Sequence, residues 1–156
     1  APKTEERRRQ LAARTWAEVK ETRLQLIATL VDHGCDVNAP HDHGITPLYM
    51  ACEFGLEDVA HTLLEAGADP SIGADDGSTP LFVAVEGGRH ALVNYLVVLG
   101  RADPNHRRRN GASALHTAAA LGDVDMVNLL VELGASVDAR NNGDWTPLFA
   151  AAGRGR

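Results

Sequence analysis

A segment of 14 residues returns along this chain at a nearly constant interval. "DHGITPLYMACEFG" at residues 42–55 is followed 33 residues later by "DDGSTPLFVAVEGG" at residues 75–88. The Thr-Pro-Leu positions recur as Ser113-Ala114-Leu115 after 34 residues and as Thr146-Pro147-Leu148 after 33 more. A fixed period of this length predicts stacked repeats, because one such unit cannot bury its apolar face alone.

Composition narrows the class of protein. The 156 residues are 44% hydrophobic but only 4% aromatic, so the core must consist of Leu, Val and Ala. A net charge of -6 gives no overall attraction to nucleic acid or an anionic membrane. Cys35 and Cys52 are the only cysteines. Two thiols without a disulfide framework, in a sequence with no apolar signal segment, predict an intracellular protein, cytoplasmic or nuclear.

Each repeat predicts two short helices and a turn-rich finger. Thr46 is a suitable N-cap and Pro47 suits the first helical position. Gly67 is placed to end the second helix in the left-handed conformation. Residues 68–77, "ADPSIGADDG", are typical of a turn. The spacing predicts that Leu48, Ala51 and Cys52 face the core from the first helix, and Val59, Leu63 and Leu64 from the second.

These residues resemble the ankyrin repeat, whose pattern is roughly D-x-x-G-x-T-P-L-H-x-A-A-x-x-G, then V-x-x-L-L-x-x-G-A-D-x-N. The resemblance covers residues 24–155. It implies an all-α solenoid of stacked helix-turn-helix units with β-hairpin-like fingers. The expected parts are N-terminal capping helices and a first finger at 1–40, repeats at 41–73, 74–107 and 108–140, and a truncated repeat at 141–156.

The chain departs from this pattern at several points. We expect an extra residue, best placed at Arg101, to distort the turn after Gly100. His116 alone keeps the family's histidine, which the resemblance implies bonds to the backbone of the neighbouring repeat. Residues 5–23 are interpreted as the first cap helix, and 24–39 as the second helix with its finger. The fourth copy shows no second helix, and self-association through this C-terminal end is a hypothesis.

The sequence contains no motif of catalysis or of cofactor binding, so we expect no enzyme and no cofactor. His33, Cys35, His41 and His43 have a spacing that zinc accepts. A hairpin, however, directs alternate side chains to opposite faces, so we expect no metal.

Arginines concentrate in one finger, at Arg107, Arg108 and Arg109, and Arg140 follows one repeat later. They can bind a carboxylate, a phosphate or an acidic peptide through charge-assisted hydrogen bonds. Alternatively they belong to a solvated finger and offset Asp75 and Asp76 in the preceding one. We expect no nucleic-acid partner, because interleaved aromatic residues for base stacking are missing.

The resemblance implies a non-catalytic protein–protein interaction module that binds its partner on the concave surface of fingers and first helices. The alternative is a regulatory domain of a larger protein that binds an anion or nucleotide with the Arg-rich finger. Trp145 either anchors a partner or only covers the stack. The candidate partner-binding residues are His43, Ile45, Phe54, Asp75, Asp76, Arg107, Arg108, Arg109, Asn110, Arg140, Asn142 and Trp145.

Asparagines in the fingers raise a separate possibility. The resemblance implies that such residues can be hydroxylated by an asparaginyl hydroxylase, and Asn38 matches better than Asn105. The alternative is an asparagine that only braces its turn.

Overall fold

The computed structural model describes residues 18–153, and the chain divides into two compact units, residues 1–36 and 37–156. In the second unit a short 3-10 helix, η1 (Asp42–Gly44), precedes the α-helices. These are α2 (Pro47–Glu53), α3 (Glu57–Glu65), α4 (Pro80–Glu86), α5 (His90–Val98), α6 (Ala114–Leu121), α7 (Val124–Glu132) and α8 (Pro147–Gly153).

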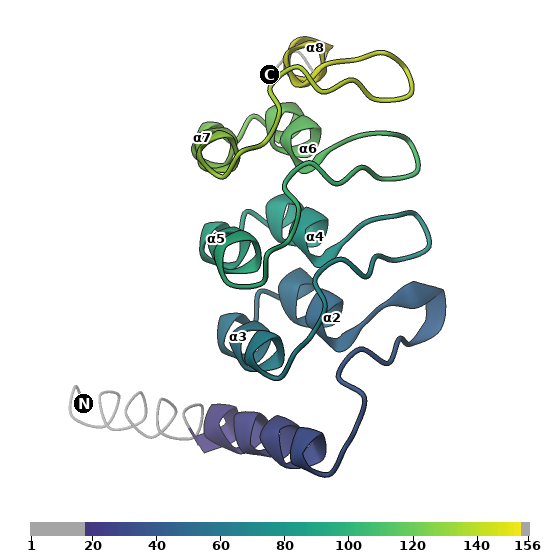
Figure 1. The fold of residues 1–156 in the computed structure, drawn as a ribbon. Helices are drawn as coiled ribbons and strands as arrows, with labels where there is room; N and C mark the ends of the chain where they lie inside the picture. Colours follow the sequence, from purple (N-terminus) through teal and green to yellow (C-terminus); the bar gives the residue numbers. More distant parts are fainter. Residues whose placement is uncertain (1–17, 154–156) are drawn as a thin grey trace, which may run out of the picture. The chain divides into compact units, whose positions relative to one another are not determined.

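The second unit is a stack of helical pairs (Figure 1). The first helices α2, α4, α6 and α8 form one column, and the second helices α3, α5 and α7 form another beside it. Between the pairs the chain projects as fingers on the side of the first helices. The described residues contain no strand, only an isolated bridge between Arg107 and Ser113. The predicted all-α solenoid is confirmed.

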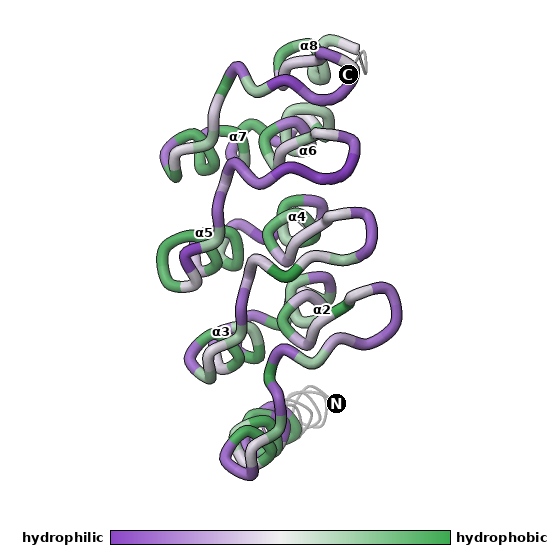
Figure 2. Tube along the Cα trace, turned by 45° about the vertical axis from the view of Figure 1, so that its right-hand side comes forward, coloured by the Kyte–Doolittle hydropathy of each residue, from purple (hydrophilic) through white to green (hydrophobic). Residues whose placement is uncertain are grey.

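The local chemistry expected of a first helix is present in α2. The Thr46 hydroxyl oxygen accepts a hydrogen bond from the Tyr49 N–H at 3.2 Å, and Pro47 begins the helix. Gly67 follows α3 with φ of +88°, which closes that helix as predicted. Apolar residues gather in the helices, and hydrophilic residues in the finger tips (Figure 2).

The core lies between the two columns. Leu48, Leu81 and Leu115, at the same position of successive repeats, are each 2% exposed or less. On α3 the prediction for Leu63 is confirmed, but Val59 and Leu64 are only half-buried. Ala60 takes the central position instead, because residues 60 and 63 share one face and 59 and 64 flank it.

The first unit differs from the predicted pair of cap helices. Residues 18–32 form one unbroken helix, so the boundary expected near residue 24 is absent. The physical reason is that no Gly or Pro interrupts the helix-forming residues between 18 and 32. The earlier part of the interpreted first helix, with Leu11 and Trp16, lies outside the described residues. Within them, no helix is long and apolar enough to cross a membrane.

The extra residue of the 34-residue step lies at Gly100 and Arg101. Gly100 is fixed as glycine by crowding, since a Cβ there would lie 2.7 Å from the Leu96 carbonyl oxygen. Arg101 then takes the left-handed conformation, with φ of +58°, that glycine takes after α3 and α7. The Ala102 N–H bonds to the Leu96 carbonyl, six residues back, whereas Ala68 bonds five residues back. The turn is lengthened as the sequence predicted.

Candidate functional site

The fingers are residues 37–46, 68–79, 102–113 and 135–146, called fingers 1 to 4, and backbone hydrogen bonds join their tips. In each step an amide N–H donates to a carbonyl oxygen of the preceding tip at 2.9–3.0 Å. These bonds order the exposed surface of the fingers and the first helices, called here the finger face. The N–H of Asp75 donates to the carbonyl of His43, that of Arg109 to Asp76, and that of Asn142 to Asn110.

The predicted residues of finger 1 differ in exposure. His43 is an exposed tip residue with φ of +62°, and its Nδ1 lies 3.3 Å from Oδ2 of the exposed Asp75. Ile45 is half-buried. The tips of fingers 1 and 2 are therefore joined by side chains as well as by backbone.

The arginines have separate environments. Arg107 donates from Nε to the Gly111 carbonyl of its own finger at 2.9 Å. Arg140 Nη1 lies 2.9 Å from Asp144 Oδ2. The exposed Arg109 side chain has no hydrogen-bond or ion-pair partner in the described part of the chain.

Arg108 ties finger 3 to the preceding repeat. Its side chain is only 19% exposed, and its guanidinium lies 4.5 Å from the centre of the Phe82 ring. Nη2 donates to Glu86 Oε1 and, at 3.3 Å, to Thr117 Oγ1, while Nη1 lies 4.0 Å from Asp76 Oδ2. The picture of a uniformly solvated finger is therefore wrong for Arg108, because stacking on Phe82 and pairing with Glu86 draw it inward.

Carboxylates collect beside Arg108, on the first two repeats. Burial, followed by the negative charges of Asp76, Glu53 and Glu86, raises the pKa of Tyr49. Hydrogen bonds from the hydroxyl and the backbone N–H of Ser78 lower the pKa of Asp76. The finger face thus changes from acidic on repeats 1 and 2 to positively charged on finger 3.

Two predicted aromatic anchors lie far apart on the finger face. Phe54 follows α2 and is 63% exposed. Trp145 is 48% exposed, and its ring lies 4.7 Å from the Phe149 ring, centre to centre. The backbone of Trp145 is also held, since its carbonyl accepts from His116 Nε2 at 2.8 Å.

A groove of about 450 Å³ opens on the finger face at repeats 3 and 4. Small residues on α6, α8 and finger 3 form part of its lining, together with Leu121 and Trp145. Its polar lining comes from Glu86, Arg108, Asn110, His116, Thr117 and Asn141. The sequence analysis did not identify Thr117 and Asn141 as site residues. An alignment of the repeats does reveal two of the small residues that line the groove with them, Ala120 and Ala150.

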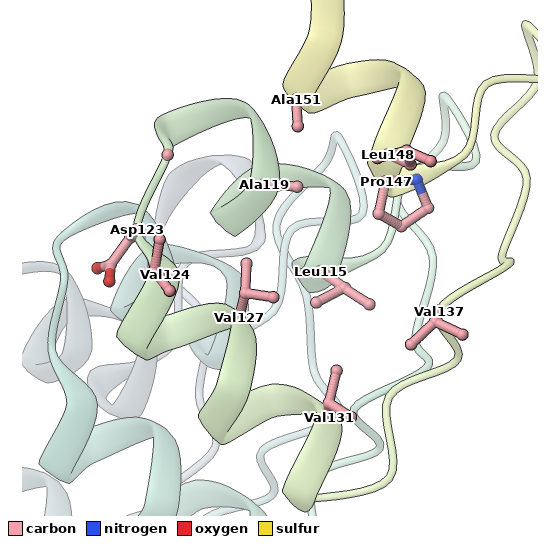
Figure 3. Close-up of a pocket in the computed structure, with 11 residues that line it drawn as sticks. Leu115, Ala119, Asp123, Val124, Val127, Val131, Val137, Pro147, Leu148 and Ala151 are labelled. Atoms are coloured by element: carbon pink, nitrogen blue, oxygen red, sulfur yellow. The ribbon is translucent and has the colours of Figure 1, made fainter. Parts of the chain in front are cut away.

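A second pocket, of about 340 Å³, lies between α6, α7 and α8 and is almost wholly apolar (Figure 3). Val124, Val131 and Val137 line it and are 69%, 42% and 54% exposed. Leu148 also lines it and is 78% exposed, although Leu48, at the same position of the first full repeat, is 1% exposed.

Other predicted residues brace neighbouring repeats. The His116 prediction is confirmed: Nδ1 accepts from the Ser113 N–H at 3.2 Å, which leaves Nε2 to donate to Trp145 of the next repeat. Asn38 Oδ1 accepts from the Asp69 N–H at 2.8 Å. Asn105 Oδ1 accepts from the Ser136 N–H at 2.7 Å. Both asparagines therefore brace the following finger, and hydroxylation of Asn38 stays a prediction.

The cysteines and histidines form no metal site among the described residues, where no group of three or more potential ligands was found. Burial raises the pKa of the Cys52 thiol to about 12, so this core thiol is protonated at neutral pH. Cys35 is exposed.

Comparison with known proteins identifies the class. The family model for ankyrin repeats, in three copies, matches residues 11–74 and 81–156. The chain belongs to the ankyrin repeat family, whose members are protein–protein interaction modules and are generally non-catalytic.

Similar stretches occur in much larger proteins. Neurogenic locus notch homolog protein 1 of Xenopus tropicalis is 35% identical over 124 residues, 78% of this chain and 5% of that protein. Potassium channel AKT1 of Oryza sativa subsp. indica is 41% identical over 64 residues, 41% of this chain and 7% of the channel. Protein phosphatase 1 regulatory subunit 12A of Mus musculus is 40% identical over 55 residues, 35% of this chain and 5% of that subunit. The chain thus spans less than a tenth of these relatives.

Proposed function

We propose that this chain binds another protein through its finger face and performs no catalysis itself. The observation that carries the proposal is the row of backbone hydrogen bonds between the finger tips. Because these bonds order the surface before a partner arrives, little conformational entropy is lost on docking. Phe54, Trp145 and the unpaired Arg109 are exposed on this ordered face and are of the residue types that commonly anchor interfaces.

The alternative of an anion- or nucleotide-binding domain has less support. Arg108 is engaged by Glu86 and Asp76, and Arg107 bonds within its own finger. Arg109 alone is unpaired among the finger-3 arginines in the described structure, and one exposed guanidinium is a weak phosphate site. The free thiols of Cys35 and Cys52 support an intracellular location, cytoplasmic or nuclear.

The test is affinity capture with quantitative mass spectrometry. The wild-type chain is compared with a triple variant, Phe54→Ala, Arg109→Glu and Trp145→Ala. A control variant carries Val98→Glu on α5, where Val98 is 59% exposed. We expect a protein that the wild type and the control retain and the triple variant loses. If the triple variant retains the captured protein and the control variant loses it, the binding surface lies on the second helices and not on the finger face.

Self-association is a second proposal, supported by the apolar pocket between α6, α7 and α8. Exposed apolar side chains that line a hollow favour association with another apolar surface. We expect a concentration-dependent mass in sedimentation equilibrium that Leu148→Glu abolishes. A strict monomer at high concentration would contradict it.

A further inference from the structure

We propose that the groove on repeats 3 and 4 receives an apolar side chain of an extended partner segment, with an Asp or Glu of that segment beside it. This inference rests on the proposed function and adds to it a site and the chemistry of the partner.

The hollow exists because repeats 3 and 4 carry small residues where the earlier repeats carry large ones. Ala120 lies at the position of Glu86 one repeat earlier and of Glu53 two repeats earlier. Ala150 lies at the position of Met50 and Val83. Ala112 and Gly153 complete this part of the lining. The small residues that widen the groove at Ala120 and Ala150 are therefore particular to this chain's third and fourth copies.

The apolar part of the groove is open to solvent and well held. Leu121 is 49% exposed and Trp145 is 48% exposed, and both line the groove. The hydrogen bond from His116 holds the backbone of Trp145, and its indole packs against the Phe149 ring. A half-exposed indole that is packed in this way, beside an aliphatic side chain, suits an apolar partner residue, because less ordering is left to occur on binding.

The two asparagine side chains of the groove present free donors. Asn110 Oδ1 accepts from the Ala112 N–H at 3.0 Å, so its amide orientation is assigned and its Nδ2 remains available. Asn141 Oδ1 accepts from the N–H groups of Gly143 and Trp145 at 2.9 and 3.0 Å. Neither Nδ2 has a partner among the described residues. Two unpaired amide donors call for an acceptor on the partner.

Charge selects a carboxylate among the possible acceptors. Glu86 is the groove's only carboxylate among its lining residues, and Arg108 already pairs with it. Arg107 and Arg109 precede Asn110 in the same finger and have no carboxylate partner among the described residues. A partner carboxylate therefore meets amide donors and net positive charge, whereas a partner ammonium meets only Glu86, whose Oε1 already pairs with Arg108.

The experiment selects phage-displayed random dodecapeptides on the immobilised wild-type chain. We expect enriched peptides to carry an aromatic or aliphatic residue within two positions of Asp or Glu. Ala120→Glu fills the hollow with the residue that α2 and α4 carry at this position, so the fold should tolerate it. It should weaken a synthetic peptide about tenfold or more in fluorescence anisotropy, and Asn94→Glu, on the exposed side of α5, should leave it unchanged.

A double-mutant cycle tests the carboxylate. Asn110→Asp keeps the Oδ1 acceptor, and so the turn, but replaces the free donor with negative charge. It should weaken the acidic peptide about fivefold or more, and the Gln or Asn analogue of that peptide by much less. Unchanged melting temperatures show that each variant is folded.

The outcomes separate the groove from the wider proposal. Enrichment of basic peptides, no enrichment, or binding that Ala120→Glu leaves intact would each overturn the groove inference. If such binding is lost with Phe54→Ala, the finger face remains the binding surface and only the groove is wrong. If neither Ala120→Glu nor Phe54→Ala weakens binding and the capture experiment also fails, both the groove inference and the finger-face proposal are wrong.

Discussion

At the scale of single residues, Arg101 takes a conformation that an arginine favours poorly. Its φ of +58° places it where glycine stands after α3 and α7, at Gly67 and Gly134. The left-handed region costs an L-residue roughly 1–2 kcal/mol, because Cβ approaches the following carbonyl oxygen. The neighbouring Gly100 cannot move into this role, because it is confined by the Leu96 carbonyl.

Arg101→Gly should therefore raise the free energy of unfolding by about 0.5–1 kcal/mol, since relief of strain exceeds the added freedom of the unfolded chain. Urea titration followed by circular dichroism measures it. Arg101→Lys is the matched control and should be neutral. A destabilised glycine variant would mean that the arginine side chain makes a contact that outweighs the strain.

The carboxylate of Asp76 links one residue to the pH dependence of stability. Ser78 hydrogen bonds lower its folded pKa, so its contribution is complete above the unfolded pKa and is lost as the pH falls through the folded pKa. Asp76→Asn keeps a hydrogen-bond acceptor but cannot titrate. Urea titrations between about pH 5 and pH 2 should show a smaller acid loss for the variant than for the wild type. Parallel curves would contradict the cause assigned to the shift.

At the scale of one element, α3 shows how a nine-residue helix divides its apolar side chains. Ala60 and Leu63 are 0% and 4% exposed, while Val59 and Leu64 flank them and are half-buried. All four residues are apolar in the sequence. The way α3 packs against its neighbours decides that Ala60 and Leu63 are the two that become buried.

Leu63→Ala should lower the free energy of unfolding by roughly 2–5 kcal/mol, because a cavity remains where the side chain was buried. Leu64→Ala is the matched control and should lower the free energy of unfolding by less than about 2 kcal/mol, since part of that side chain already faces water. Denaturant titration of both variants decides between them. An equal loss would show that α3 is rotated relative to the described packing.

At the scale of the whole array, contacts between repeats decide which charges are available. Arg108 lies in finger 3 but pairs with Glu86 and Asp76 of the preceding repeat and stacks on Phe82. The same side chain thus connects two repeats and neutralises carboxylates that would otherwise face a partner.

Arg108→Glu should destabilise the array by roughly 1.5–3 kcal/mol, because it removes charge-assisted hydrogen bonds and adds a carboxylate to an acidic cluster. Arg109→Glu, the adjacent exposed residue, should change stability by less than about 0.5 kcal/mol. Thermal and urea unfolding measure both. Equal stability of the two variants would show that Arg108 makes no stabilising contact and behaves as a solvated surface residue.

The inter-repeat role of His116 was implied by the resemblance to the ankyrin repeat. The sequence by itself determined the repeat period, the order of helices and fingers, and the capping at Thr46 and Gly67. These follow from local rules, since a cap, a left-handed glycine and an apolar spacing act within a few residues. The unbroken helix at 18–32 differs from the two helices that the family resemblance implies, because no Gly or Pro separates its residues. The separation of Arg107, Arg108 and Arg109 into bonded, half-buried and free side chains was decided only by the tertiary structure. So was the groove beside Trp145. Both depend on side chains 22 to 37 positions apart, such as Glu86 with Arg108 and Arg108 with Trp145, which come together only when the repeats stack.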